Sequence, residues 1–388
     1  MRVVQACRRA VAVATLSASA ALCVNVAPAH AETPGTLISV AAQPDGWHGV
    51  SGGSVVEYWM RASDGTPRQA SGALFVPQGA PPAAGWPVVA YDHGTSGLGA
   101  GCGGQSDPAG HPYQQIRSKE DQLIQRLLGQ GFAVVAPDYL GLGRFDTGPH
   151  PYLEIASEAT ATIDLLRAAR TTHPELSRTW AVLGVSQGGQ AALGTGHLQA
   201  TYAPDLDFRG TIAIDPESDV EKVLPLAGPN IPAVRGGDGA MSFFVSILAG
   251  LRAARPDVHV DQYLTPQGRE VLDSVGTRCL DGITERVRGL GVGDLLARPL
   301  ADEPIRSALD TYLTVPTSGY DAPILLLLNI TDTVVPSPLH AALAAQFAAN
   351  GVDFQTVTGT GSHTQLNPPM WAAIDSFLDR VKAPAPQR

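Results

Sequence analysis

The sequence WAVLGVSQGGQ, at residues 180–190, places a serine between two glycines where two predicted elements meet. Trp180–Val185 has the apolar character of a buried strand, and Gly189–Gln199 has the composition of a helix. A sharp strand-to-helix turn leaves no room for side chains beside the serine, so the Gly-x-Ser-x-Gly pattern is typical of it. Such a turn raises the Ser186 hydroxyl above the edge of a sheet. The alternative interpretation is a capping serine in a glycine-rich connection.

Strand-like and helix-like segments alternate along most of the chain, which favours a mostly parallel sheet with helices on both faces. The predicted strands are Val55–Met60, Ala70–Val76, Pro87–Tyr91, Phe132–Ala136, Trp180–Val185, Gly210–Ile214, Ile324–Asn329 and Asp353–Val357. The predicted helices are Asp121–Leu128, Glu154–Arg170, Gly189–Gln199, Pro338–Ala349 and Pro369–Val381. We expect the first two strands to form a hairpin and residues 32–53 to be an irregular lead-in.

The alternation stops between residues 219 and 320, where helices and loops are predicted. Met241–Leu251 is the most apolar piece of this segment, and it is too short to span a bilayer. We expect residues 219–320 to form a helical cap between the sixth and seventh predicted strands, dividing the sheet domain into residues 32–218 and 321–388. Phe244 and its apolar neighbours would either form the wall of an acyl pocket or be buried inside the cap.

A serine hydroxyl becomes a good nucleophile only when a base takes its proton. Ligands of parallel sheets bind outside the carboxyl ends of the strands, so the base and its acid should lie in loops there. His363 follows the last predicted strand, and Asp332 follows the seventh. The order Ser, Asp, His along the chain is that of the α/β-hydrolase fold. Asp215, after the sixth strand, is the alternative acid.

The remaining histidines, among them His93, His150 and His340, are interpreted as solvated or capping side chains. With His363 as the base, activity should fall on the acid side near the ordinary histidine pKa of about 6.5.

The negative charge that develops on a substrate's carbonyl oxygen needs two hydrogen-bond donors. The first expected donor is the backbone N–H of Gln187, the residue after the nucleophile. The second is the N–H of Thr95, in the loop Asp92-His93-Gly94-Thr95 after the third predicted strand.

Residues 1–31 have the pattern of a secretory signal peptide: early arginines, an uncharged stretch, and a small-x-small site ending at Ala31. The stretch is mostly Ala, Ser and Thr, so a membrane-spanning helix is disfavoured. Cleavage after Ala31 removes three arginines and no acid, which changes the formal net charge from −10 to −13. This charge disfavours nucleic acid and anionic membranes as partners. The sequence therefore predicts a secreted protein without a membrane span.

Cys102 and Cys279 are the only cysteines left after this cleavage. A single pair in an exported protein predicts a disulfide, and two buried thiols are the alternative. The chain has neither a CxxC nor an HExxH motif, so we predict no metal site.

These motifs together resemble the secretory lipase family of the α/β-hydrolases. The resemblance is carried by the signal peptide, Asp92-His93-Gly94-Thr95, Pro137-Asp138-Tyr139-Leu140-Gly141-Leu142-Gly143, Gly184–Gly188, Asp332 and His363. It implies a capped lipase or esterase that acts on lipid or small-molecule esters without a metal or organic cofactor. The His-Gly-Thr loop differs from that of the yeast members, so the resemblance supports Thr95 less than it supports the other site residues. An exported serine peptidase of the same fold and a binding protein without catalysis are the alternatives.

Overall fold

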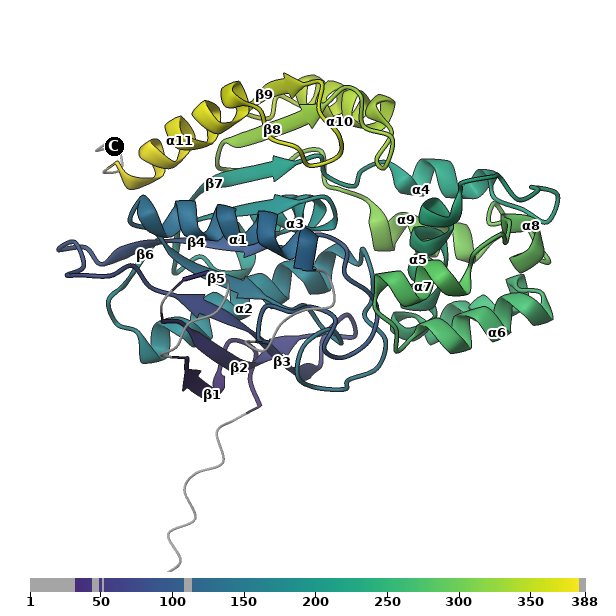
Figure 1. Cartoon of the computed structure of the whole chain (residues 1–388), viewed down its shortest axis with the longest axis horizontal. Helices are drawn as coiled ribbons and strands as arrows, with labels where there is room; N and C mark the ends of the chain where they lie inside the picture. The colour runs from purple at the N-terminus through teal and green to yellow at the C-terminus, as the bar shows by residue number, and fades with distance from the viewer. Residues whose placement is uncertain (1–31, 44–48, 51, 108–113, 384–388) are drawn as a thin grey trace, which may run out of the picture. The chain divides into compact units, whose positions relative to one another are not determined.

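One nine-stranded sheet, in the order β1-β2-β3-β5-β4-β6-β7-β8-β9, organises the part of the chain that the structure describes (Figure 1). The structure is a computed structural model, and it describes residues 32–43, 49–50, 52–107 and 114–383. The predicted signal peptide lies outside these residues. The strands are β1 Leu37–Ala42, β2 Ser54–Arg61, β3 Pro67–Phe75, β4 Trp86–Asp92, β5 Ala133–Pro137, β6 Leu176–Val185, β7 Asp207–Ile214, β8 Ile324–Asn329 and β9 Phe354–Gly359.

The six strands from β4 to β9 run parallel, and β1, β2 and β3 add an antiparallel extension beside β5. The mostly parallel sheet and the predicted hairpin are confirmed. The prediction of an irregular lead-in is wrong at Leu37–Ala42, because this segment pairs with β2 as the edge strand β1. A short, half-buried edge strand has no strong apolar pattern of its own, and its pairing partner stabilises it.

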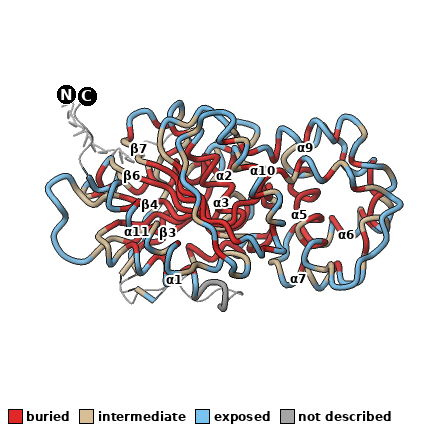
Figure 2. Tube along the Cα trace, turned by 90° about the horizontal axis from the view of Figure 1, so that it is seen from above, coloured by how far each residue is buried: buried red, intermediate tan, exposed pale blue. Residues whose placement is uncertain are grey.

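Helices cover both faces of the sheet, as predicted. Helices α1 (Gln114–Gly129) and α11 (Pro368–Lys382) share one apolar cluster with the strands. On the other face, α2 (Ile155–Thr172) and α3 (Gln187–Tyr202) pack in a second cluster, and α10 (Ser337–Ala349) packs in a third. The strands are therefore apolar on both sides, and their residues form the dense buried region in Figure 2.

Between β7 and β8 the chain forms helices only, and we call residues 219–320 the helical insertion. Its elements are α4 Val220–Val223, η1 Leu224–Leu226, α5 Asp238–Ala254, η2 Pro256–Val258, η3 Val260–Tyr263, α6 Pro266–Val275, α7 Leu280–Arg286, α8 Val292–Leu295 and α9 Ile305–Leu313. In Figure 1 they lie beyond the carboxyl ends of the parallel strands. No helix among the described residues is both long and apolar enough to cross a membrane.

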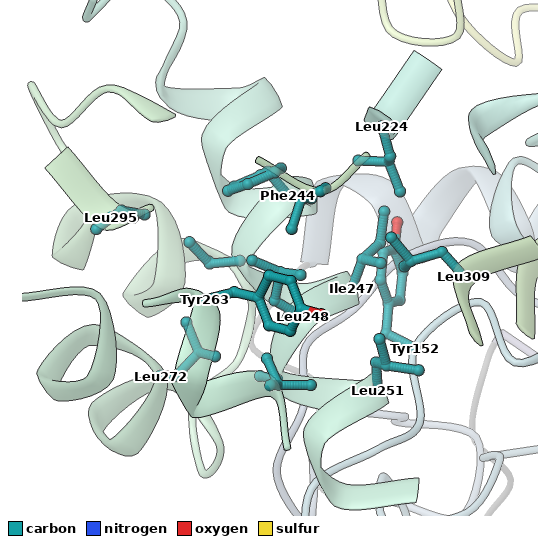
Figure 3. Close-up of a cluster of buried hydrophobic side chains, with 14 of the residues drawn as sticks. Tyr152, Leu224, Phe244, Ile247, Leu248, Leu251, Tyr263, Leu272, Leu295 and Leu309 are labelled. Atoms are coloured by element: carbon teal, nitrogen blue, oxygen red, sulfur yellow. The ribbon is translucent and has the colours of Figure 1, made fainter. Parts of the chain in front are cut away.

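The helical insertion has an apolar core of its own, and its longest helix, α5, lies in it (Figure 3). Leu248, Leu251 and Tyr263 are each 2 % exposed or less, and Phe244 is 8 % exposed. Of the two alternatives for Phe244, the structure favours burial inside the insertion over a place in a pocket wall.

A disulfide joins Cys102 to Cys279 with the Cα atoms 5.3 Å apart, which confirms the predicted pair. Backbone hydrogen bonds flank it, from Leu98 N to Arg278 O at 2.9 Å and from Leu280 N to Ser96 O at 3.0 Å. The loop after β4 is therefore fixed to the helical insertion.

Candidate active site

Ser186 lies on the turn between β6 and α3 with φ 55° and ψ −120°, a backbone conformation that a non-glycine residue adopts only under strain. The turn has no space for side chains beside it. A Cβ on Gly184 would be 1.8 Å from Gly188 O, and one on Gly188 would be 2.0 Å from Asp92 O. These contacts explain the Gly-x-Ser-x-Gly pattern, and they show that the turn packs directly on the end of β4.

The structure brings Ser186, His363 and Asp332 together from three strand-end loops. His363 Nε2 lies 2.8 Å from Ser186 Oγ, and His363 Nδ1 lies 2.6 Å from Asp332 Oδ2. The other carboxylate oxygen of Asp332 accepts hydrogen bonds from Val334 N at 2.8 Å and Val335 N at 3.2 Å. A carboxylate only accepts, so the hydrogen-bond pattern assigns the imidazole proton to Nδ1 and leaves Nε2 to accept the serine proton.

Opposing effects act on the pKa of His363. Burial lowers this pKa, but the hydrogen bond and charge of Asp332 raise it more, with further contributions from Glu217 and Asp215. The net result is a raised pKa, so the expectation of an unperturbed histidine is wrong. For Asp332, burial raises the pKa, and the hydrogen bond and charge of His363 lower it to a net decrease. The pair is therefore poised as neutral imidazole and carboxylate at alkaline pH.

His363 is hydrogen-bonded to Asp332, whereas Asp215, the alternative acid, is hydrogen-bonded to the neighbours of the triad. Its Oδ1 accepts from Asn329 N at 2.7 Å, and its Oδ2 accepts from Asn329 Nδ2 at 2.7 Å and Thr364 N at 2.8 Å. Asn329 precedes the loop of Asp332, and Thr364 follows His363 directly. Asp215 therefore braces the two loops that carry the other acid and the base.

The interpretation of His93, His150 and His340 as solvated or capping side chains is wrong, because all three are buried. Their burial comes from packing between segments that are distant in the sequence. His340 Nδ1 lies 3.9 Å from Asp215 Oδ1, close behind the site.

Asp215, Asp332 and His340 are the described residues whose arrangement comes nearest to a metal site, with one ligand atom each within 4.8 Å of the others. Both carboxylates already accept hydrogen bonds from backbone N–H groups. The arrangement therefore fits support of the loops better than coordination of an ion.

Glu217 is a group of the site that the sequence pattern did not indicate. Its N–H donates to Ser186 O at 3.3 Å, and its side chain is buried. Burial raises the pKa of Glu217 to about 7, with His363 acting to lower it and Asp332 and Glu158 acting to raise it further. Its position three residues beyond the end of β7 is the one available signal, since ligand sites form at such ends.

The two expected oxyanion donors belong to Gln187, which follows the serine, and to Thr95, whose neighbour Gly94 lies beside it. Gln187 is the first residue of α3, so its N–H has no acceptor within the helix and lies at the positive end of the helix dipole. The loop after β4 runs alongside, because a Cβ on Gly94 would be 3.7 Å from Ser186 Cβ. Thr95 follows in that loop, and its hydroxyl lies 2.8 Å from Tyr152 OH.

The sheet topology, the serine on a strand-to-helix turn and the helical insertion before the penultimate strand define an α/β-hydrolase fold. The structure of lipase A from Candida antarctica has the same fold: it matches with a TM-score of 0.74 and 20 % identity, over 92 % of this chain and 84 % of that chain. The family model of the secretory lipases matches residues 114–383. The chain belongs to the secretory lipase family.

Two curated relatives match part of the chain. A protein named lipase A from Arthroderma benhamiae is 26 % identical over 258 residues, which cover 64 % of this chain and 52 % of the relative. A Mycobacterium tuberculosis protein described as a probable inactive lipase is 25 % identical over 247 residues, which cover 60 % and 50 %. The chain thus spans about half the length of the curated relatives that it matches.

Proposed function

We propose that this protein is a secreted serine hydrolase of carboxylic esters that works through an acyl-enzyme on Ser186. The observation that carries the proposal is the hydrogen-bonded series from Ser186 Oγ through His363 to Asp332, at 2.8 and 2.6 Å. Membership of the secretory lipase family supports both the activity and an extracellular location. The signal-peptide pattern at residues 1–31 supports the location independently.

In the proposed acylation step, Ser186 Oγ attacks the acyl carbon while His363 Nε2 takes the hydroxyl proton. Asp332 holds the imidazole in the Nδ1–H form and stabilises its charged state. The N–H groups of Gln187 and Thr95 would bind the oxyanion of the tetrahedral intermediate. When the intermediate collapses, the ester bond breaks and the departing alkoxide takes the proton from His363.

Deacylation repeats these roles with water as the nucleophile. His363 removes a proton from the water, the hydroxide adds to the acyl carbon, and Ser186 Oγ leaves with that proton. The products are a carboxylic acid, an alcohol and the free enzyme, so the cycle needs no cofactor.

We propose esters with apolar acyl chains, such as acylglycerols, as the substrates, and the helical insertion as a cap over the site. The apolar composition of the insertion and the family support this substrate class. Ser186 is 7 % exposed, which places its hydroxyl below the outer surface of the protein.

A fluorophosphonate probe and p-nitrophenyl butyrate test the proposal together. The wild-type protein should hydrolyse the ester and become labelled on Ser186, and Ser186→Ala should lose both properties while remaining folded. The comparison matters because one curated relative is described as a probable inactive lipase. An unlabelled, inactive wild-type protein would reject catalysis in favour of a binding role.

A specific observation also keeps an exported serine peptidase as the second candidate. A peptidase that recognises a substrate amine needs an acidic group near the triad, and Glu217, whose charge acts on His363, is the group to test for that role. Turnover of aminoacyl p-nitroanilides, lost in Glu217→Gln, would favour the peptidase. Turnover of p-nitrophenyl esters alone would favour the esterase.

A further inference from the structure

The side chain of Gln187 is held in a buried polar cluster behind the proposed oxyanion site. Gln187 Nε2 donates to Glu158 Oε1 at 2.7 Å and lies 2.8 Å from His150 Nε2. All three side chains are completely buried. Burial of polar groups is costly unless they are hydrogen-bonded, so this cluster fixes the first residue of α3 in one conformation.

The protons of the cluster can be assigned from its acceptors. His150 Nδ1 lies 2.9 Å from the carbonyl oxygen of Leu140, which can only accept, so Nδ1 carries the proton. The other ring nitrogen then accepts one proton of the Gln187 amide, and Glu158 accepts the second. Leu153 N also donates to Glu158 Oε1, at 3.1 Å.

The same short loop contacts the second proposed donor. Tyr152 is two residues after His150, its N–H donates to His150 O at 2.8 Å, and its hydroxyl lies 2.8 Å from Thr95 Oγ1. His150 and Tyr152 thus support the two sides of the proposed oxyanion site, Gln187 and Thr95.

This loop is also packed against the helical insertion. A Cβ on Gly250 of α5 would lie 2.6 Å from Tyr152 N and 3.1 Å from His150 O. Figure 3 shows the ring of Tyr152 among Ile247, Leu251 and Leu309 of the insertion. The ring belongs to the insertion's core, while the hydroxyl reaches the loop after β4.

We propose that Glu158, His150 and Tyr152 are positioning residues for the oxyanion site, acting through the amide side chain of Gln187 and the hydroxyl of Thr95. The inference rests on the proposed function and deepens it. An oxyanion is stabilised only by donors that are already fixed at the correct position, and displacements near 1 Å are expensive. None of the three needs to touch the substrate.

Two variants test this proposal with the full-length protein. Each removes a side-chain hydrogen bond that positions a donor, and each keeps the donor N–H groups. Tyr152→Phe removes only the hydroxyl, and Gln187→Met removes the amide side chain but keeps the backbone N–H. The matched control is Tyr312→Phe, because Tyr312 lies in the same apolar core and its hydroxyl has no partner among the described residues. The measurements are kcat, KM and Tm, with the Ki of a trifluoromethyl ketone analogue of the ester.

Oxyanion-site N–H groups that are no longer held in position bind the transition state less tightly and leave ground-state binding unchanged. We expect kcat of Tyr152→Phe and Gln187→Met to fall about tenfold with little change in KM, and the Ki of the ketone to rise by the same factor. Tyr312→Phe should keep wild-type values. Wild-type kcat and Ki in both variants would overturn the inference while leaving the esterase assignment intact. A loss of kcat without any change in Ki would also overturn it, since that pattern indicates a general structural defect. A wild-type protein without esterase activity would reject the proposed function and this inference together.

Discussion

Replacement of Glu217 by glutamine should stabilise the protein at alkaline pH. The pKa of this carboxyl is raised to about 7 by burial, against an ordinary value of 4.5. A shift of that size corresponds to about 3 kcal/mol, since each pKa unit is about 1.36 kcal/mol. The folded state prefers the protonated acid, so its stability falls as the pH rises from the unfolded value through about 7. Glu217→Gln should therefore be up to about 3 kcal/mol more stable than wild type at pH 8 and no different at pH 4.

The same substitution should change the pH profile of the proposed esterase. The negative charge of Glu217 raises the pKa of His363, adding to the larger effect of Asp332 and opposing that of burial. Without that charge, His363 loses its proton at a lower pH. The acid limb of kcat/KM should therefore move toward lower pH in Glu217→Gln.

Urea denaturation at pH 4, 6 and 8 measures the free energy of unfolding. The pH profile of kcat/KM on p-nitrophenyl butyrate between pH 5 and 9 gives the position of the acid limb. Glu270→Gln is a suitable control, because the Glu270 side chain is 78 % exposed and should affect neither quantity. A stability difference that is the same at all three pH values would refute the raised pKa of the buried Glu217 carboxyl. An unchanged acid limb would show that the charge of Glu217 does not affect the pKa of His363.

Ser186→Ala and Asp332→Asn should each abolish most esterase activity with the fold intact, and the double variant should be little worse than either in kcat, since a triad acts as a unit. Phe244→Ala should destabilise the protein by about 3–5 kcal/mol, seen as a lower Tm, because it opens a cavity in the insertion's core; a changed acyl-chain profile at unchanged Tm would instead indicate a pocket wall. Intact-mass analysis should find no free thiol at Cys102 or Cys279, and reduction should cost up to roughly 5 kcal/mol in denaturation experiments, given a sequence separation of 177. EDTA should leave ester turnover unchanged, whereas loss that zinc or calcium restores would assign an ion to the site.

The sequence predicted the position of the serine and its partners because the constraints on them are local. The turn around Ser186 accepts only glycine at its crowded positions, and this requirement is visible in the sequence. Parallel strands then bring their carboxyl-end loops to one edge, so Asp332 and His363 could be chosen as residues that follow the last two strands. The sequence favoured Asp332 and left Asp215 as the alternative acid, since both follow strands of the same edge. Their hydrogen bonds distinguish them in the structure.

Burial was the part that local pattern could not predict. His150 lies in a Gly-Pro-His-Pro segment whose composition is typical of an exposed loop, yet its side chain is buried against Gln187 and Glu158. Glu217 similarly has no motif around it. In both cases at least one deciding contact comes from a segment more than 25 residues away, Gln187 for His150 and His363 for Glu217, and no short window of sequence contains it. Polar groups buried in this way mark the surroundings of the site more clearly than its motifs do.

Helix α5 shows why the orientation of the insertion also needed the structure. Its apolar residues lie on more than one side, so periodicity alone cannot tell which side packs inward. Gly250 resolves the question: glycine within a helix costs about 1 kcal/mol relative to alanine, and here a Cβ would collide with the backbone of His150 and Tyr152. The close approach gives that cost a structural reason, since it allows the insertion to pack directly on the loop that contacts Gln187 and Thr95. The insertion and the proposed oxyanion site are therefore linked through the backbone of His150 and Tyr152 as well as through the disulfide between Cys102 and Cys279.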